Sequence, residues 1–303
     1  MSVTGGINAI APWFGGKRTM APLIVDELGT HTQYFEPFCG SMAVLFAKMP
    51  SQKETVNDLH GDLINLARGL QQQDEAEKLY DRLGRTLFSQ GILEQARIEL
   101  GDEQVFPPCA SNAMLPDRAY WYFIGSWMAR NGVAGTARVD YQMAVRWTKS
   151  GGSPTVRFRN AIESIPWWHD RLRNVVIMKR DAFSILDRFE DTAGTAIYCD
   201  PPYAEDTRSM NKNGSGGKYK HEFHHGGGMF GDDHSRLVDV LKSYKHARIV
   251  VSYYDSPRIR ELYDGWTFVE HTRQKHLHAQ NGRGARPKEA PEVLIINGPS
   301  YAA

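Results

Sequence analysis

The stretch Thr195-Ala196-Ile197-Tyr198-Cys199-Asp200-Pro201-Pro202-Tyr203 is an apolar run that ends in a polar, proline-rich tetrad. The apolar run predicts a buried strand. Two consecutive prolines have fixed φ angles and no N–H, so we expect the turn after the strand to be stiff, with carbonyl groups left for a ligand. Taken alone, the tetrad also fits an ordinary strand-ending turn, because Asp and Pro are common turn residues.

The tetrad suits the methylation of an amino group on a flat, conjugated ring. The exocyclic amine of adenine or cytosine is a poor nucleophile because its lone pair is delocalised into the ring. A carboxylate at Asp200 and the carbonyl of Pro201 can accept its two hydrogens, bend the nitrogen toward a tetrahedral shape and offset the charge that develops there. Tyr203 can stack on the face of the ring. The candidate catalytic residues are Asp200, Pro201, Pro202 and Tyr203.

Alternating strands and helices on both sides of this stretch predict an α/β core that is split in the sequence. Between residues 71 and 173 the alternation stops and the chain becomes helical and aromatic. This part also carries a hairpin signal, with expected strands at 146–149 and 155–159 around a Ser-Gly-Gly-Ser-Pro turn. We therefore predict a discontinuous catalytic domain, 1–70 and 174–303, and an inserted target-recognition domain, 71–173. The strands expected in the core are 33–38, 54–56, 175–178, 195–199, 247–253, 267–271 and 293–296, the last two forming an antiparallel pair at the sheet edge.

The composition is that of an ordinary globular protein, with 303 residues and 41% hydrophobic content. No apolar stretch approaches the length of a membrane span and no signal-peptide pattern opens the chain, so we expect no membrane partner and a cytoplasmic location in a bacterial or phage-infected cell. Cys39, Cys109 and Cys199 are widely spaced, which argues against a disulfide framework or a structural zinc site.

The formal net charge is only +1, so the distribution of charge matters more than its sum. Between Arg138 and Arg180 there are nine basic residues and three acidic ones. This stretch is a candidate face for phosphate contacts, and a merely solvated basic surface is the alternative interpretation.

The first strand ends near a turn that favours an adenosine-bearing cofactor. In open α/β sheets, ligands bind at the carboxyl ends of the strands, where Gly40 allows close approach and Asp58 can accept hydrogen bonds from ribose hydroxyls. The glycine spacings fit neither a dinucleotide fingerprint nor a P-loop. S-adenosylmethionine is the cofactor that fits. Lys17 can pair with its carboxylate, and Asp181 either accepts from its adenine amine or simply caps a helix.

Five segments together resemble the Dam-like, class alpha N6-adenine-specific DNA methyltransferases, with prophage and bacteriophage members the nearest. They are Trp13-Phe14-Gly15-Gly16-Lys17, Phe35-Glu36-Pro37-Phe38-Cys39-Gly40-Ser41, Asn57-Asp58 with Leu63-Ile64-Asn65, Asp200-Pro201-Pro202-Tyr203, and Ser252-Tyr253-Tyr254-Asp255-Ser256. The resemblance implies a Rossmann-like methyltransferase sheet, S-adenosylmethionine as methyl donor, and double-stranded DNA whose target adenine is flipped out. It also implies a cofactor pocket lined by Trp13, Lys17, Glu36, Phe38, Gly40, Asp58 and Asp181.

The chain departs from the family pattern at three places. Met42 stands where a second glycine is common, and Ala182 stands where a phenylalanine is common in the Dam branch. The segment 126–132 resembles the Dam recognition region only loosely. Within it, Arg130 and Asn131 are either base readers, because Arg pairs with guanine and Asn with adenine, or structural turn residues. The candidate DNA contacts are Arg130, Asn131, Arg146, Lys149, Arg157 and Arg159.

Two other functions fit the same residues. A methyltransferase of this fold can act on RNA or on a protein amide, and a DNA-binding protein can retain the fold after losing catalysis. Residues 204–233 are rich in Gly, Lys and His and are expected to be either a lid over the site or a plain linker. His221, His224 and His225 lie there, but their spacing lacks a metal-binding scaffold, and methyl transfer needs no metal.

Overall fold

A computed structural model describes residues 6–101, 115–130, 142–145, 152–203, 232–274 and 289–302, without the side chains of 271–274 and 289–291. Within these residues, one seven-stranded sheet has the order β3-β2-β1-β4-β5-β7-β6. The first five strands are parallel, and β7 runs antiparallel to both of its neighbours. This confirms the predicted methyltransferase sheet with an antiparallel C-terminal pair. The strands are β1 (Gln33–Glu36), β2 (Lys53–Asn57), β3 (Val176–Met178), β4 (Thr195–Cys199), β5 (Arg248–Tyr254), β6 (Thr267–Gln274) and β7 (Glu289–Ile296).

Strand β4 lies near the middle of the sheet and is buried along its whole length. Ala196 and Tyr198 pack into the core on one face, and Ile197 and Cys199 pack into the core on the other. A parallel sheet covered on both faces requires such an uninterrupted apolar run. Helices α1 (Ala21–Leu28) and α2 (Ala43–Ala47) cover the first face. The second face is covered by α9 (Phe183–Leu186), α10 (Asp233–Ser243) and α11 (Pro257–Leu262).

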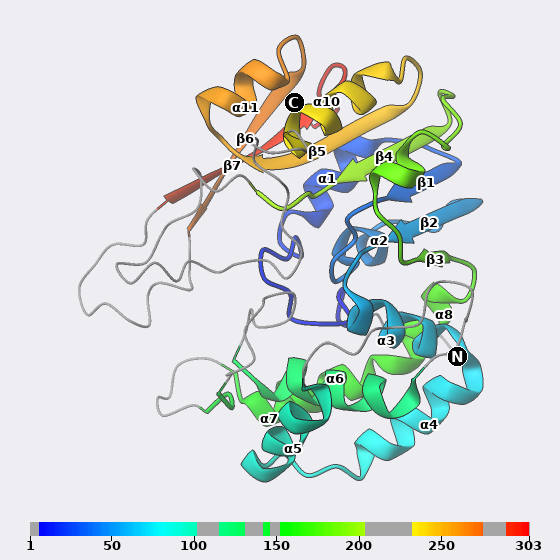
Figure 1. Cartoon of the computed structure of the whole chain (residues 1–303), viewed down its shortest axis with the longest axis vertical. Helices are drawn as coiled ribbons and strands as arrows, with labels where there is room; N and C mark the ends of the chain where they lie inside the picture. Colours follow the sequence, from blue (N-terminus) through cyan, green and yellow to red (C-terminus); the bar gives the residue numbers. More distant parts are fainter. Residues whose placement is uncertain are drawn as a thin grey trace.

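Within the described residues, six further helices form a helical lobe next to the β3 edge of the sheet, in the lower half of Figure 1. Its interior is aromatic, with Trp127 and Trp168 stacked at 6.2 Å and both fully buried. A buried ion pair between Asp62 and Arg118, at 2.5 Å, joins the first helix of the lobe to the fourth. The helices of the lobe are α3 (Gly61–Gln71), α4 (Gln73–Gly84), α5 (Gln90–Leu100), α6 (Pro116–Met128), α7 (Pro154–Glu163) and α8 (Ile165–Leu172).

The predicted strand at 155–159 is wrong, because these residues belong to helix α7. Pro154 stands in the first turn of that helix, where a missing N–H costs nothing. Phe158, Ala161 and Ile162 are buried at helical spacing, and this packing outweighs the β-branched residues that suggested a strand. The other half of the expected hairpin, 146–149, lies outside the described residues.

The predicted domain boundaries fall at the end of α3 and just after α8, and they stay a prediction. Cys39 and Cys199 are buried free thiols, and Cys109 is outside the description. In the part of the chain that the structure describes, no helix is long and apolar enough to cross a membrane.

Candidate active site

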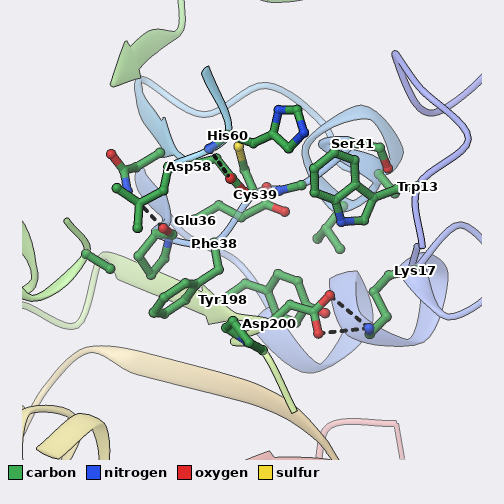
Figure 2. Close-up of a pocket in the computed structure, with 18 of the residues that line it drawn as sticks. Trp13, Lys17, Glu36, Phe38, Cys39, Ser41, Asp58, His60, Tyr198 and Asp200 are labelled. Carbon is green, nitrogen blue, oxygen red and sulfur yellow. Dashed lines mark hydrogen bonds and ion pairs between the residues drawn. The ribbon is translucent and has the colours of Figure 1, made fainter. Parts of the chain in front are cut away.

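A pocket of about 310 Å³ opens where β1, β2 and β4 end. The strand order reverses between β1 and β4, which is where open α/β sheets bind ligands. Figure 2 shows Asp200 and Lys17 on one side of this pocket and Asp58 and His60 on the opposite side. All seven residues that the sequence predicts for a cofactor line the pocket: Trp13, Lys17, Glu36, Phe38, Gly40, Asp58 and Asp181.

The turn after β1 depends on Gly40. Its φ angle is +44°, and a Cβ at this position would lie 2.7 Å from Nε1 of Trp13. Any side chain would therefore push the indole ring out of the pocket wall. The ring of Trp13 in turn meets His60 edge-on at 5.4 Å, so that two segments distant in the sequence form one wall.

Asp58 ties the turns after β1 and β2 together. One carboxylate oxygen accepts the N–H of Gly40 at 2.8 Å, and the other accepts the N–H of His60 at 2.9 Å. Bonds from backbone donors to a charged oxygen are among the stronger ones in proteins. The carboxylate therefore shapes the pocket before any ligand binds. The hydrogen bond from a ribose hydroxyl to Asp58 stays a prediction.

Met42 precedes helix α2 with a φ angle of +62° and a ψ angle of +30°. Left-handed backbone of this kind favours glycine, and among the described non-glycine residues Met42 alone adopts positive φ. Met42, the departure seen in the sequence, therefore adopts a backbone shape that favours glycine. The methionine side chain is fully buried in the core, which offsets the conformational cost.

Glu36 ends β1 and is buried beneath the pocket. The hydroxyl of Tyr34 donates a hydrogen bond to its carboxyl group at 2.9 Å. Burial raises the pKa of Glu36 to about 8, although the bond from Tyr34 opposes that shift. At neutral pH this side chain is therefore largely protonated in the protein alone.

Asp200 follows β4, and its side chain is 19% exposed. Both of its carboxylate oxygens lie 2.8 Å from the ammonium group of Lys17, which is buried one turn before α1. The sequence predicts Lys17 as the partner of a cofactor carboxylate, and that role stays a prediction. In the structure the lysine contacts the tetrad instead.

A second carboxylate shares Lys17. Glu292 of β7 lies 3.2 Å from the ammonium group and accepts a hydrogen bond from the hydroxyl of Tyr203 at 2.6 Å. Burial raises the pKa of Asp200, and the bond to Lys17 only partly opposes this. For Lys17, burial lowers the pKa, but the two carboxylates outweigh it and the net shift is upward. One positive charge thus serves two acidic groups.

Tyr203 is almost fully buried, with 1% of its surface exposed. Its ring meets Tyr254 edge-on at 4.6 Å and lies tilted against Tyr253 at 5.7 Å. Stacking of a base on this ring stays a prediction. It requires that the atoms covering the ring move when DNA binds.

Asp181 caps a helix turn in the structure, because its carboxylate accepts the N–H of Ser184 at 3.1 Å. Its predicted contact with the cofactor stays open. The residue after Ala182, Phe183, lines the pocket and places an aromatic ring one position beyond the one at which the family resemblance expects it. Sequence reasoning also missed His60 and Arg236, two further residues of the lining.

The candidate DNA contacts divide into three groups. Arg130 and Arg159 are exposed, at the end of α6 and on α7. Arg157 instead turns inward and donates to the carbonyls of Trp127 and Ala129 at 2.8 and 2.7 Å, so it holds the segment that carries Arg130. Three of the candidates lie outside the described residues: Asn131, Arg146 and Lys149.

The described residues hold no group of three or more His, Cys, Asp or Glu side chains that could bind a metal ion. His221, His224 and His225 are outside the description.

The sheet, in which β7 runs antiparallel to both of its neighbours, and the pocket at the strand ends have the architecture of the Rossmann-like methyltransferases. The chain belongs to the D12 class N6 adenine-specific DNA methyltransferases, because the model of that family matches residues 13–97 and 136–278. This membership supports DNA adenine methylation and implies the use of S-adenosylmethionine. It favours DNA over the RNA and protein-amide alternatives.

Relatives with known names agree with the family. The retron Ec67 DNA adenine methylase of Escherichia coli is 25% identical, over 96% of this chain and 92% of its own length. The type II methyltransferase M1.LlaDCHI of Lactococcus lactis is 27% identical, over 96% and 95%. A DNA adenine methylase of Vibrio cholerae is 22% identical, over 98% of each chain. A solved SAM-dependent methyltransferase from Agrobacterium tumefaciens aligns with 93% of this chain and 61% of its own, at 9% identity and a TM-score of 0.35.

Proposed function

We propose that this chain methylates N6 of an adenine that has been flipped out of duplex DNA, with Asp200 as the residue that contacts the amine. The observation that carries the proposal is the largely buried Asp200 carboxylate, which borders the pocket and directly follows a central strand. An N6 amine inside a stacked base pair cannot reach such a group, so extrusion of the base is part of the proposal. The reaction would take place where DNA lies, in the cytoplasm of a bacterial or phage-infected cell.

The pocket residues fit S-adenosylmethionine. Trp13, Phe38 and Phe183 offer aromatic surfaces, and Asp58, just after β2, offers carboxylate oxygens that can accept hydrogen bonds from ribose hydroxyls. Glu36 adds an acidic group beneath the pocket floor. When bound, the cofactor supplies an activated methyl group. The residues that would hold it are Trp13, Lys17, Glu36, Phe38, Gly40, Asp58 and Asp181.

Asp200 acts on the amine as an acceptor of one of its hydrogens. A carboxylate oxygen has two lone pairs, so it can bind Lys17 and the substrate amine together. The backbone carbonyl of Pro201 accepts the second hydrogen, and Pro202 keeps the turn stiff. Negative charge held in a largely buried site stabilises the positive charge that grows on nitrogen as its bond to the methyl carbon forms. The charge of Lys17 opposes the upward shift that burial gives to the pKa of Asp200, and so favours its ionised form.

Exposed basic residues of the helical lobe support the DNA side of the proposal. Arg130 and Arg159 can contact phosphates or base edges, and Arg157 positions the segment of Arg130 from behind. Asn131, Arg146 and Lys149 complete the proposed set.

The test is mass spectrometry of nucleosides from unmethylated DNA incubated with S-adenosylmethionine and the wild type, Asp200→Ala or Asp239→Ala. Asp239 is an exposed carboxylate on α10 and serves as the matched control. We expect N6-methyladenine with the wild type and the control only. Product from Asp200→Ala at the wild-type rate would remove Asp200 from the mechanism. Absence of product from all three, with DNA still bound, would support the silent DNA-binding alternative.

A further inference from the structure

Glu292 occupies a position where an apolar residue would suit the strand. It shares a sheet face with Leu294 and Ile296, both of which are fully buried in the core. Glu292 itself is 5% exposed. A buried carboxylate costs free energy unless it is paired and hydrogen-bonded. Two partners of Glu292 are Tyr203, at 2.6 Å, and Lys17, at 3.2 Å.

Those two partners are the last residue of the tetrad and the cation bound to its first residue. The bond from Tyr203 fixes the hydroxyl end of its ring against β7. Strand pairing sets Glu292 opposite Tyr254, and Tyr254 packs edge-on against the same tyrosine ring. The orientation of Tyr203 is therefore determined from the C-terminal strand pair, although the residue belongs to the turn after β4.

We infer that Glu292 is a positioning residue for methyl transfer: it holds the hydroxyl of Tyr203 and takes part of the charge of Lys17, which leaves Asp200 a stronger acceptor for the substrate amine. The inference rests on the proposed role of Asp200. Without a negative charge at position 292, Lys17 would pair with Asp200 alone. Asp200 would then be a weaker acceptor for the amine, because the whole charge of Lys17 would act on its carboxylate oxygens.

The charge of Glu292 also acts on the titration of Asp200. Burial is the largest cause of the raised pKa of Asp200, and the charge of Glu292 adds to it. Removing that charge lowers the pKa, so the form of the enzyme with ionised Asp200 persists to lower pH. The described groups that face Asp200 from the surrounding elements are Lys17 before α1, Glu36 on β1, Tyr198 and Cys199 on β4, Tyr203 after β4, Ser252 and Tyr253 on β5 and Glu292 on β7.

The experiment compares Glu292→Gln with the wild type in single-turnover methylation of unmethylated DNA, which reports methyl transfer without product release. Glutamine keeps an oxygen for Tyr203 and Lys17 but removes the charge. We expect the single-turnover rate constant to fall about 10-fold. We also expect the acidic limb of its pH profile to move to lower pH, while the Kd for S-adenosylmethionine by calorimetry changes by less than about twofold. Glu270→Gln, an exposed carboxylate on β6, is the matched control with unchanged rate and profile.

The variant Glu292→Asp tests whether the shift of the acidic limb comes from the lost charge or from a disturbed fold. The aspartate retains the negative charge, so we expect the acidic limb to return to its wild-type position. An acidic limb that stays in place in Glu292→Gln, or one that moves equally in both variants, would overturn the inference. Asp200→Ala keeps the two proposals distinct. If Asp200→Ala is active, the proposed role of Asp200 is wrong. If Asp200→Ala is inactive and Glu292→Gln behaves like the wild type, only the role of Glu292 is wrong.

Discussion

Asp58 and Asp200 stand at the carboxyl ends of two parallel strands and border the same pocket, yet the chain holds them in different ways. Asp58 is bound by two backbone N–H groups from turns that lie close to it in the sequence. Asp200 is bound by the side chain of Lys17, which is 183 positions away. Backbone donors cannot change partner without a change of fold, whereas a lysine side chain can turn. This difference fits the proposed roles, in which the Asp58 side of the pocket holds the cofactor and the Asp200 side responds to the substrate amine.

The largest expected effect comes from Asp200→Asn, which preserves shape and removes the charge. We expect the single-turnover rate constant for methyl transfer to fall about 10³-fold, as for the loss of one preorganised electrostatic group. The Kd for S-adenosylmethionine should stay close to that of the wild type. A large loss of cofactor affinity with little loss of rate would reverse the roles assigned to the two sides of the pocket.

Glu36 allows a test through stability. Its pKa is raised by burial to about 8 in the folded protein, against 4.5 as the reference value. A raised carboxyl pKa contributes stability below the unfolded pKa, and this stability is lost as pH rises toward the folded value. Between about pH 5 and about pH 7.5 the wild type should lose roughly 3 kcal/mol from this group. Glu36→Gln should lack that slope, as measured by urea unfolding across the range, and an unchanged slope would contradict the assignment.

For Asp58→Asn we expect a smaller effect, which falls on stability and cofactor affinity and not on the rate of methyl transfer. The amide has one carbonyl oxygen, so one of the two backbone N–H groups would face an NH₂ group instead of an acceptor. The unfolding free energy should fall by about 1–3 kcal/mol, and the cofactor Kd should rise by about 10-fold. The single-turnover rate at saturating cofactor should change by less than about threefold. A rate loss as large as that of Asp200→Asn would erase the difference between the two carboxylates.

Much of this site could be predicted from sequence because its determinants are local. The turn around Gly40, the apolar run of β4 and the tetrad after it each lie within a short segment, and all seven predicted cofactor residues line the pocket. The pairing of Lys17 with Asp200 and Glu292 could not be predicted, because it depends on a strand that the sheet inserts between β5 and β6. The only signal for Glu292 was its place directly before the apolar run 293–296 that the sequence predicted as a strand.

The helical lobe shows the other limit. Thr155 and Val156 favoured a strand by their branching, but the spacing of Phe158, Ala161 and Ile162 and the proline at the helix start prevailed. Arg157 was grouped with exposed basic residues by its charge alone, whereas tertiary packing turns it toward carbonyls at the C-terminal end of α6. Charge and branching are properties of single residues, and burial is decided by their neighbours.

The smallest expected effect is the difference in stability between two replacements of Met42, next to the Asp58 side of the pocket. Replacement by alanine removes a fully buried side chain and keeps the left-handed strain, whereas replacement by glycine removes both. The lost packing costs about 2–5 kcal/mol, which exceeds the relief of strain, so both variants should be less stable than the wild type. The free energy of unfolding of the glycine variant should nevertheless exceed that of the alanine variant by about 1 kcal/mol, whereas alanine is usually the more stabilising of the two residues. Urea unfolding of the pair measures this difference, and an alanine variant more stable than the glycine variant would mean that the turn tolerates a side chain without strain.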